Sequence, residues 1–461
     1  MLGACLALAL AAVAQPAPSP SHHAAMTVAS PLPLALDETT GAAASPPAQV
    51  LPMAYRVAQQ RQVLPPARDF DVGLFELMAE EMTFGQRVPG LAMAIVHNGR
   101  ILSARGYGVT DVSNPQPVDA HTVFRLASLS KAFAGALTGL LVADGTVRWD
   151  SKVSEYVPGF QLSDPWATGR VTVADLLSHR VGLKAYNAFD RDIEADARYQ
   201  DVTLKLASAP LECLPGQCYA YQNVAFSVVG DVLAQATGSD YAQLVQRRLL
   251  QPLGMQDASL GLEGIQSSRN WARPHVRSRN NWVSVTPKPT YYRLPPAAGV
   301  NASASDMAQW LLAQTGHRPD VLSAPLLATL HAPIIATPGE MRSSWRRERL
   351  NSAGYALGWR VFDYAGHVVV FHAGAVQGYR GLTAILPERD LGIAILWNSN
   401  SGLPGGLLPT VLDRAIGLPE QRWLDDGLDM DSLLARHAAD PGTEATGGAS
   451  TSTQGAKASP K

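Results

Sequence analysis

Ser128 and Lys131 are the residues whose types and spacing first suggest chemistry. They lie three positions apart near the start of an Ala-, Leu- and Gly-rich stretch that ends at Gly145. Residues three apart share one face of a helix. A serine in the first turn lies where free backbone N–H groups stabilise negative charge, and a desolvated lysine one turn later loses its proton and activates the hydroxyl. We therefore expect a nucleophile and its base. A capping serine beside a solvated lysine is the structural alternative.

Two later segments carry groups that would complement this pair. Tyr221 stands two residues before Asn223, which places both side chains on the same side of an extended turn. A phenol can pass a proton, and an amide can hydrogen-bond a substrate carbonyl. The third segment, His372-Ala373-Gly374, follows an expected strand, and its small residues let a substrate approach the backbone closely.

The order of these three segments resembles that of the class C β-lactamase and penicillin-binding-protein family of serine hydrolases. The surrounding sequence is similar as well, over about residues 70–420, and it includes Val171–Leu183, Pro252–Met255 and Gly299–Asp306. The resemblance implies an α+β β-lactamase/DD-peptidase-like fold. In that fold an antiparallel sheet drawn from both chain ends is flanked by helices and joined by a helical lobe.

The resemblance also implies a role for each matching residue. Ser128 would be acylated, and Lys131 and Tyr221 would move protons to the leaving group and from the deacylating water. Asn223 would bind the amide side chain of the substrate. The backbone N–H groups of Ser128 and Ala375 would form the oxyanion hole.

The third motif departs from the β-lactamase pattern, because His372 stands where lysine is usual. A histidine is cationic only in part near neutrality, so we expect a weaker grip on a substrate carboxylate. His372 and Gly374 would then position the substrate, although His372 serving only a strand-end hydrogen bond is the alternative. Five further residues either line the cleft or lie on the surface: Tyr186, Trp397, Arg346, Arg347 and Arg349. His179 is expected to cap a loop under the site, and nothing in the sequence explains Arg180.

These residues need rigid elements to position them. Residues 70–82 place apolar side chains at helical spacing. Asn98-Gly99 is a hairpin signal between apparent strands at 91–97 and 100–107. Further strands are expected at 367–371, 382–386 and 392–397, with a mainly helical region between the two strand groups. Strands at both ends and helices between them favour an α+β arrangement.

The chain ends differ in composition from this region. Residues 1–14 have the apolar character of a secretory signal peptide, and Leu2–Cys5 is an alternative lipid-attachment sequence. Residues 15–67 are expected to form a disordered linker, 68–434 the hydrolase domain and 435–461 a disordered tail. In an exported chain, Cys213 and Cys218 would form a small disulfide loop, with two free thiols as the alternative.

Composition narrows the class of function. Lys+Arg is 37 and Asp+Glu is 39, a net charge of −2, which argues against nucleic-acid binding. No G-x-S-x-G or H-E-x-x-H sequence occurs, and no metal or organic cofactor is implied. We therefore expect a monomeric bacterial hydrolase, periplasmic, secreted or lipid-anchored, without an integral membrane segment after processing. Its small-molecule or peptidoglycan-derived substrate would be a β-lactam or a D-Ala-D-Ala-type peptide. An esterase and a penicillin sensor without turnover are the alternatives.

Overall fold

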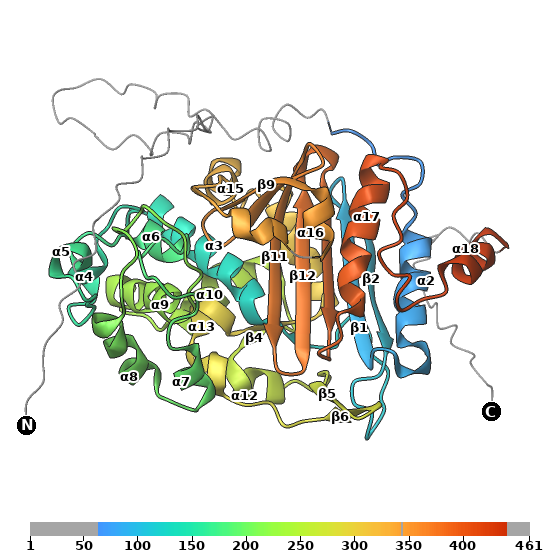
Figure 1. Cartoon of the computed structure of the whole chain (residues 1–461), viewed down its shortest axis with the longest axis horizontal. Coiled ribbons are helices and arrows are strands. Elements are labelled where there is room, and N and C mark those ends of the chain that lie inside the picture. The colour runs from blue at the N-terminus through green and yellow to red at the C-terminus, as the bar shows by residue number, and fades with distance from the viewer. Residues whose placement is uncertain (1–62, 343, 440–461) are drawn as a thin grey trace, which may run out of the picture. The chain divides into compact units, whose positions relative to one another are not determined.

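An eight-stranded antiparallel sheet forms the centre of the fold. The computed structural model describes residues 63–342 and 344–439. The strand order is β2-β1-β13-β12-β11-β10-β9-β8 (Figure 1). The strands are β1 (Gly90–His97), β2 (Arg100–Gly108), β8 (Ile335–Ala336), β9 (Leu350–Tyr355), β10 (Arg360–Tyr364), β11 (His367–Val376), β12 (Tyr379–Leu386) and β13 (Leu391–Trp397). The first two strands pair with the last through β1 and β13, so both ends of the folded region build the sheet, as predicted.

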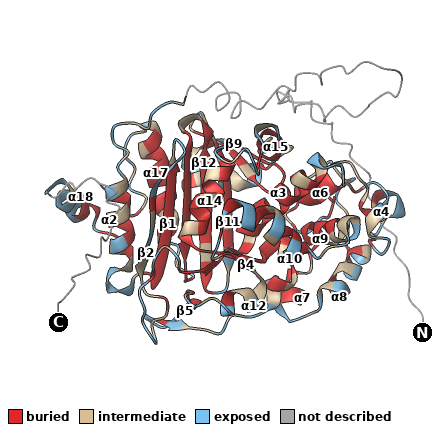
Figure 2. Ribbon diagram, turned by 180° about the vertical axis from the view of Figure 1, so that it is seen from behind, coloured by how far each residue is buried: buried red, intermediate tan, exposed pale blue. Residues whose placement is uncertain are grey.

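The sheet is buried on both faces because alternate residues of its strands enter two different cores. On β1, Ala92 and Ala94 belong to one core, whereas Leu91 and Met93 belong to the other. This follows from the two-residue period of a strand. In Figure 2 the central strands are largely red, and exposed residues gather on peripheral elements such as α18.

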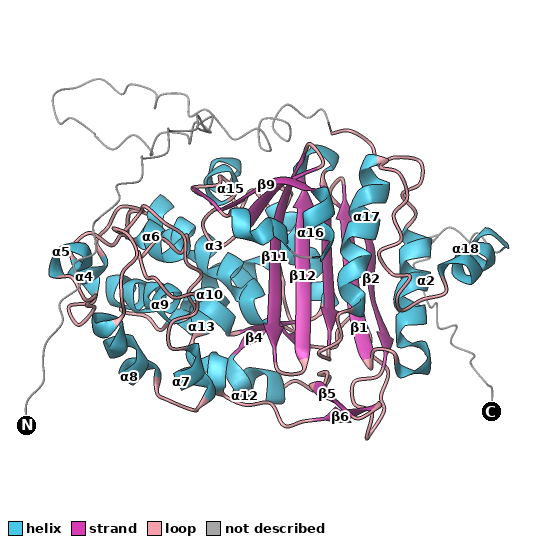
Figure 3. Cartoon of the chain, in the orientation of Figure 1, coloured by secondary structure: helices cyan, strands magenta, loops and turns pink. Residues whose placement is uncertain are grey.

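Helices cover the two faces unequally (Figure 3). One face is packed by α2 (Val72–Thr83), α16 (Ser344–Arg349) and α17 (Leu407–Ile416), and α18 (Met430–Ala439) packs against α2. The other face and the adjoining helical lobe contain α3 (Ser130–Ala143), α4 (Val153–Tyr156), α5 (Pro165–Thr168), α6 (Val173–Leu177), α7 (Asp190–Glu194), α8 (Tyr199–Leu204), α9 (Val224–Thr237), α10 (Tyr241–Val245), α11 (Gln251–Leu253), α12 (Gly261–Gln266), α13 (Pro295–Ala298), α14 (Ala304–Gln314) and α15 (Ala324–Leu330). No helix among the described residues is long and apolar enough to cross a membrane.

Two small sheets complete the architecture. β3 (Phe124–Arg125), β7 (Val300–Ala302) and β4 (Ser259–Leu260) form a three-stranded antiparallel sheet beside the start of α3. β5 (His275–Ser278) and β6 (Asn281–Ser284) form a hairpin. The β3–β7 pairing matters for function because β3 leads directly into the Ser128 segment.

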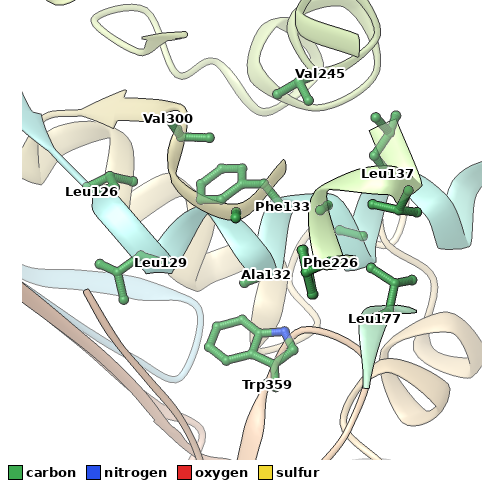
Figure 4. Close-up of a cluster of buried hydrophobic side chains, with 14 of the residues drawn as sticks. Leu126, Leu129, Ala132, Phe133, Leu137, Leu177, Phe226, Val245, Val300 and Trp359 are labelled. Atoms are coloured by element: carbon green, nitrogen blue, oxygen red, sulfur yellow. The ribbon is translucent and has the colours of Figure 1, made fainter. Parts of the chain in front are cut away.

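Helix α3 is the central element of the larger core. Its residues Phe133 and Leu137 are buried, and Phe226 and Trp359 pack around it (Figure 4). The ring of Phe133 stacks on that of Trp310, with centroids 3.8 Å apart. These contacts on all sides remove α3 from water, and Lys131 with it.

Two glycines let the β9–β10 turn reach the backbone of α3. A Cβ on Gly135 would lie 2.2 Å from the carbonyl oxygen of Leu357, and a Cβ on Gly358 would lie 2.3 Å from that of Lys131. Both contacts are with backbone, which cannot move aside as a side chain can. Glycine at these positions therefore brings the turn close enough to seal Lys131.

Both predicted boundaries of the folded region need correction. Leu64 and Ala67, placed in the linker, donate backbone hydrogen bonds to Glu388 and Ala415. Helix α18 continues past the predicted end at Leu434 to Ala439. Backbone hydrogen bonds stabilise the first of these segments, and a short helix forms in the second. Amino-acid composition predicts neither feature. The predicted signal peptide, residues 15–62 of the linker and residues 440–461 of the tail lie outside the described residues.

The Gly135 contact predicts an effect on stability. Gly135→Ala should lower the free energy of unfolding by about 1–3 kcal/mol, because overpacking against the Leu357 carbonyl outweighs the better helix propensity of alanine. Gly159→Ala is the matched control, since no atom lies within 4 Å of its added Cβ. Urea denaturation of both variants measures the difference, and equal stability of the two would refute the close contact.

Candidate functional site

A cleft of about 400 Å³ lies where the end of β11 meets the start of α3. The predicted residues that line it are Ser128, Tyr221, Asn223, Gly374 and Ala375. The other lining residues are Tyr186, Asn187, Asp190, Tyr291, Ala298, Glu340, Arg360, Ala373 and Val376. Segments more than two hundred residues apart in the chain thus converge on one site.

Ser128 lies in a short 3-10 turn, Ala127–Leu129, immediately before α3 rather than inside its first turn. The preceding residue, Ala127, has a φ of 50°, which a non-glycine residue adopts only at a cost. This turn is fixed on one side by β3 and on the other by β11. It presents the Ser128 side chain to the cleft.

Gly374 brings β11 against the Ser128 turn. A Cβ at this position would lie 2.2 Å from the carbonyl oxygen of Leu126 and 3.2 Å from the backbone nitrogen of Ser128. Only glycine permits this approach. The backbone of Ala375, the next residue, is thereby held beside that of Ser128, as an oxyanion hole made of their two N–H groups requires.

Lys131 is completely buried and surrounded by acceptors. Its Nζ lies 3.3 Å from Ser128 Oγ, 2.7 Å from Asn223 Oδ1 and 3.1 Å from the carbonyl oxygen of Ala297. Burial lowers the pKa of Lys131 well below its ordinary value, Asp190 opposes this, and the cation of Arg360 adds to it. The neutral amine is therefore readily accessible.

The hydrogen bonds of the neutral amine orient its lone pair. A neutral amine has two N–H donors, and the Asn223 and Ala297 oxygens can only accept. With both donors engaged there, the lone pair faces Ser128 Oγ. The geometry thus suits removal of the Ser128 proton.

Tyr221 completes the polar group at the nucleophile. Burial raises the pKa of Tyr221 to about 12, against the opposing effects of Arg360 and of a hydrogen bond with Ser128. The phenol therefore stays protonated near neutrality. Its ring also contacts Lys131, with Nζ 4.7 Å from the ring centroid. A protonated hydroxyl at this place can donate to Ser128 and relay a proton.

Asn223 is more engaged than the resemblance implies. Its Oδ1 accepts from Lys131, while its Nδ2 donates to Asn187 Oδ1 at 3.2 Å and to Asp190 Oδ2 at 2.7 Å. Both N–H donors of this amide are already used inside the protein. Asn223 therefore positions Lys131, and a substrate side chain would compete with Asn187 and Asp190 for it.

His372 is fully buried and does not line the cleft. Its Nδ1 donates to the carbonyl oxygen of Ala373 at 2.8 Å, which leaves Nε2 as an acceptor for the hydroxyl of Tyr355 at 3.0 Å. Burial, with the cation of Arg360, lowers the pKa of His372 well below 6.5. The imidazole is thus neutral, so we revise its expected role from partial cation to positioning residue.

Arg360 supplies the cation that the motif lacks. Its Nη1 donates to His372 Nε2 at 3.3 Å, and its Nε lies 3.1 Å from Glu340 Oε1. Glu340 also accepts from Arg346, so one carboxylate bridges two guanidinium groups. The sequence reasoning missed Arg360 and Glu340. The sequence signal that could have revealed Arg360 is an arginine at the first position of β10, the strand that pairs with β11.

The predicted disulfide is present between Cys213 and Cys218. Arg180, which had no predicted role, pairs with Asp175 at 2.9 Å and exchanges hydrogen bonds with Gly216 inside the disulfide loop. It therefore anchors the loop that leads into Tyr221.

Other singled-out residues have mainly structural positions. His179 Nδ1 accepts from the backbone of Gln222, which supports the predicted role under the site. Tyr186 lines the cleft, but Trp397 is buried on the opposite face of the sheet. Arg349 pairs with Asp413, and Arg347 is exposed. Within residues 63–342 and 344–439, no group of three or more His, Cys, Asp or Glu side chains is arranged to hold a metal ion.

The neutral state of His372 predicts a pH profile. An imidazolium that held a substrate carboxylate would be lost above its pKa, and kcat/KM would then fall as the pH rises through about 6.5. We expect no such fall, because the pKa of His372 lies well below 6.5. Profiles of the protein and of His372→Gln should have the same shape from about pH 5 to about pH 9. A decline near pH 6.5 that disappears in the variant would contradict this.

Comparisons with known proteins agree with this geometry. The chain is 27% identical over 392 residues to "Unguisins hydrolase ungD" of Aspergillus violaceofuscus, covering 79% of this chain and 68% of that protein. It is 26% identical over 316 residues to "Protein flp" of Staphylococcus aureus, covering 68% of this chain and 60% of that one. The chain thus spans less than two thirds of the length of the latter relative.

Solved structures show the same fold. The octameric penicillin-binding protein homologue from Pyrococcus abyssi aligns with a TM-score of 0.67 and 23% identity, over 77% of this chain and 79% of that one. SurE aligns with a TM-score of 0.61 and 21% identity, over 79% and 78%. The predicted α+β fold is therefore confirmed. A family model described as Beta-lactamase matches residues 74–417, and the chain belongs to the Beta-lactamase family.

Proposed function

We propose that the protein is a serine hydrolase that works through an acyl-Ser128 intermediate. The observation that carries this proposal is the fully buried Lys131, whose Nζ lies 3.3 Å from Ser128 Oγ with its donors engaged elsewhere. An amine in this state has no structural purpose that an apolar side chain would not serve better. It is suited to take the proton of a nucleophilic hydroxyl.

Acylation follows from the positions of these groups. The substrate carbonyl oxygen binds between the N–H groups of Ser128 and Ala375, each worth about 3 kcal/mol of transition-state stabilisation in comparable sites. Ser128 Oγ bonds to the carbonyl carbon while its proton moves to Lys131. The proton then passes to the leaving nitrogen or oxygen, directly or through the Tyr221 hydroxyl, and the bond to the leaving group breaks.

Deacylation reverses the proton path. A water molecule attacks the acyl carbon and gives its proton to the Tyr221–Lys131 pair, and Ser128 Oγ recovers a proton as it leaves. A sensor that acylates without turnover does not need this second half. The intact Lys131–Tyr221 arrangement therefore favours an enzyme over a sensor.

Arg360 favours substrates with a carboxylate. It lines the cleft beside Tyr221, with its guanidinium carbon 5.1 Å from the centroid of that ring. Burial alone would lower the pKa of Arg360. Glu340 and three tyrosines raise it by more than burial lowers it, so the net shift is upward and the group stays cationic. β-Lactams and D-Ala-D-Ala-type peptides both carry a carboxylate beside the scissile amide. A further support for D-configured substrates is that the structural neighbour SurE has been solved with D-Leu.

We also propose that the enzyme works outside the cytoplasm. The Cys213–Cys218 disulfide supports this location, because such bonds persist in oxidising compartments and are rare in cytosolic proteins.

Replacing the nucleophile tests the reaction class. Ser128→Ala should lower kcat/KM on the order of 10⁴-fold or more, whereas Ser267→Ala, at an exposed position, should leave it unchanged. The substrates are a fluorescent penicillin, a chromogenic cephalosporin, a p-nitrophenyl ester and a D-Ala-D-Ala peptide. Turnover that survives in Ser128→Ala would refute the nucleophile. Labelling of Ser128 without turnover of any substrate would favour the sensor.

Replacing the cleft cation tests the substrate class. Arg360→Gln should lower kcat/KM by about 10- to 100-fold for substrates with a carboxylate, mainly through KM, because a charged hydrogen bond is lost. The p-nitrophenyl ester, which has no carboxylate, should lose much less, only through the higher pKa that Lys131 has without this cation. Arg347→Gln is the matched control, since Arg347 is exposed. Equal losses for both substrates would show that Arg360 is structural, and a strong preference for the ester in the unmodified protein would favour an esterase.

A further inference from the structure

Asp190 is a buried carboxylate in the wall of the cleft that the proposed mechanism does not use. It is the first residue of α7, and the left-handed Phe189 before it (φ 67°) turns the chain at this point. Its residue surface is 9% exposed. It lines the cleft together with Asn187, Asn223 and Tyr291.

The hydrogen bonds of Asp190 are incomplete. Its Oδ2 accepts from Asn223 Nδ2 at 2.7 Å and from the Tyr291 hydroxyl at 3.1 Å. Its Oδ1 has no partner within the described part of the chain. No ion pair joins Asp190 to a Lys, Arg or His side chain there either. A buried carboxylate with an unused oxygen and no cation is costly unless something else binds it.

The other carboxylate of the cleft is in the opposite situation. Glu340 lies between the guanidinium groups of Arg346 and Arg360, so its charge is compensated. Among the described residues, the basic group that acts on Asp190 is the amine of Lys131, across Asn223, and in the reactive state this amine is neutral. The Tyr291 hydroxyl that contacts Asp190 also lies 2.7 Å from Glu194 Oε1, which adds negative potential. The region around Asp190 therefore carries uncompensated negative charge.

Asp190 is also well placed relative to the nucleophile. Consecutive hydrogen bonds lead from Asp190 to Asn223, from Asn223 to Lys131 and from Lys131 to Ser128. Both N–H groups of Asn223 already donate to protein acceptors. On this side of the cleft, Asp190 Oδ1 is therefore the acceptor that can still take a hydrogen bond. Arg360 comes from β10 and shares no hydrogen-bond partner with Asp190.

We propose that Asp190 binds a free ammonium group of the substrate, so that the site prefers acyl donors with an unblocked amine next to the scissile carbonyl. This inference rests on the proposed acyl-Ser128 mechanism and names the substrate class as aminoacyl amides or esters. The ammonium completes the coordination of the carboxylate by a charge-assisted hydrogen bond. Burial raises the pKa of Asp190 against the opposing effects of Asn223 and Tyr291, and a bound ammonium would lower it again.

A purely structural role for Asp190 predicts a different outcome. If Asp190 only orients Asn223, and through it Lys131, its replacement slows every substrate to the same extent. If it binds the substrate amine, its replacement affects only substrates that carry the amine. The ratio of the two rates therefore separates the roles.

The experiment compares alanine p-nitroanilide, in both configurations, with its N-acetyl derivative. The unmodified protein should prefer the free amine by about 10-fold or more in kcat/KM. Asp190→Asn should remove most of this preference, mainly through KM, because the free-amine substrate loses about 10-fold more in kcat/KM than the N-acetyl substrate. Asp192→Asn is the matched control, because it removes one charge from the same helix at a site paired with Lys205.

A second measurement needs no variant. In the unmodified protein the preference for the free amine should fall as the pH rises above about 8, where an α-amino group loses its proton. No preference in the unmodified protein, or an equal loss for both substrates in Asp190→Asn, would overturn the inference. If the N-acetyl substrate is still hydrolysed in a Ser128-dependent way, the proposed function survives that failure. Turnover independent of Ser128 would refute the proposed function and this inference with it, whereas no turnover of either anilide would refute this inference alone.

Discussion

The removal of one lysine amine from water is the constraint on which the rest of the structure depends. Lys131 lies on α3, which is packed on all sides, and its hydrogen-bond partners among the described residues are Ser128, Asn223 and the Ala297 carbonyl. An exposed amine would hold its proton and could not accept one from serine. The surrounding core therefore makes Lys131 a base, and the cation of Arg360 strengthens the effect.

Close backbone contacts at three glycines place the segments that enclose Lys131 and Ser128. Gly135 and Gly358 bring the β9–β10 turn onto α3, and Gly374 brings β11 onto the Ser128 turn. Each contact joins elements from distant parts of the chain. The same turn leads into Arg360, so the sealing of Lys131 and the placement of the cleft cation depend on one segment. Stability and catalysis are thus coupled through packing.

Local patterns were enough to predict several of the elements, but they missed strands β8, β9 and β10 and the contacts between distant segments. The hairpin at Asn98-Gly99, helix α2 and the Ser128–Lys131 pair follow from short-range spacing. Arg360 meets His372 only because β10 and β11 pair in a particular register, with Arg360 opposite Phe371. The hydrogen bond from Asn223 to Asp190 also joins residues far apart in the chain, so the spacing of residues in the sequence does not predict it. The chain-end boundaries were misplaced because backbone pairing, such as Leu64 to Glu388, has no compositional signal.

The central claim is that Lys131 is neutral when the site works, and an NMR titration of its ε-amine tests this most directly. The protein is labelled at its lysine side chains, and the signal of Lys131 is assigned by its disappearance in Lys131→Arg. The structure predicts a titration midpoint well below the ordinary value of 10.5, because burial disfavours the ammonium form. A midpoint at or above 10.5 would contradict it, since the amine would then stay charged and could not act as the base.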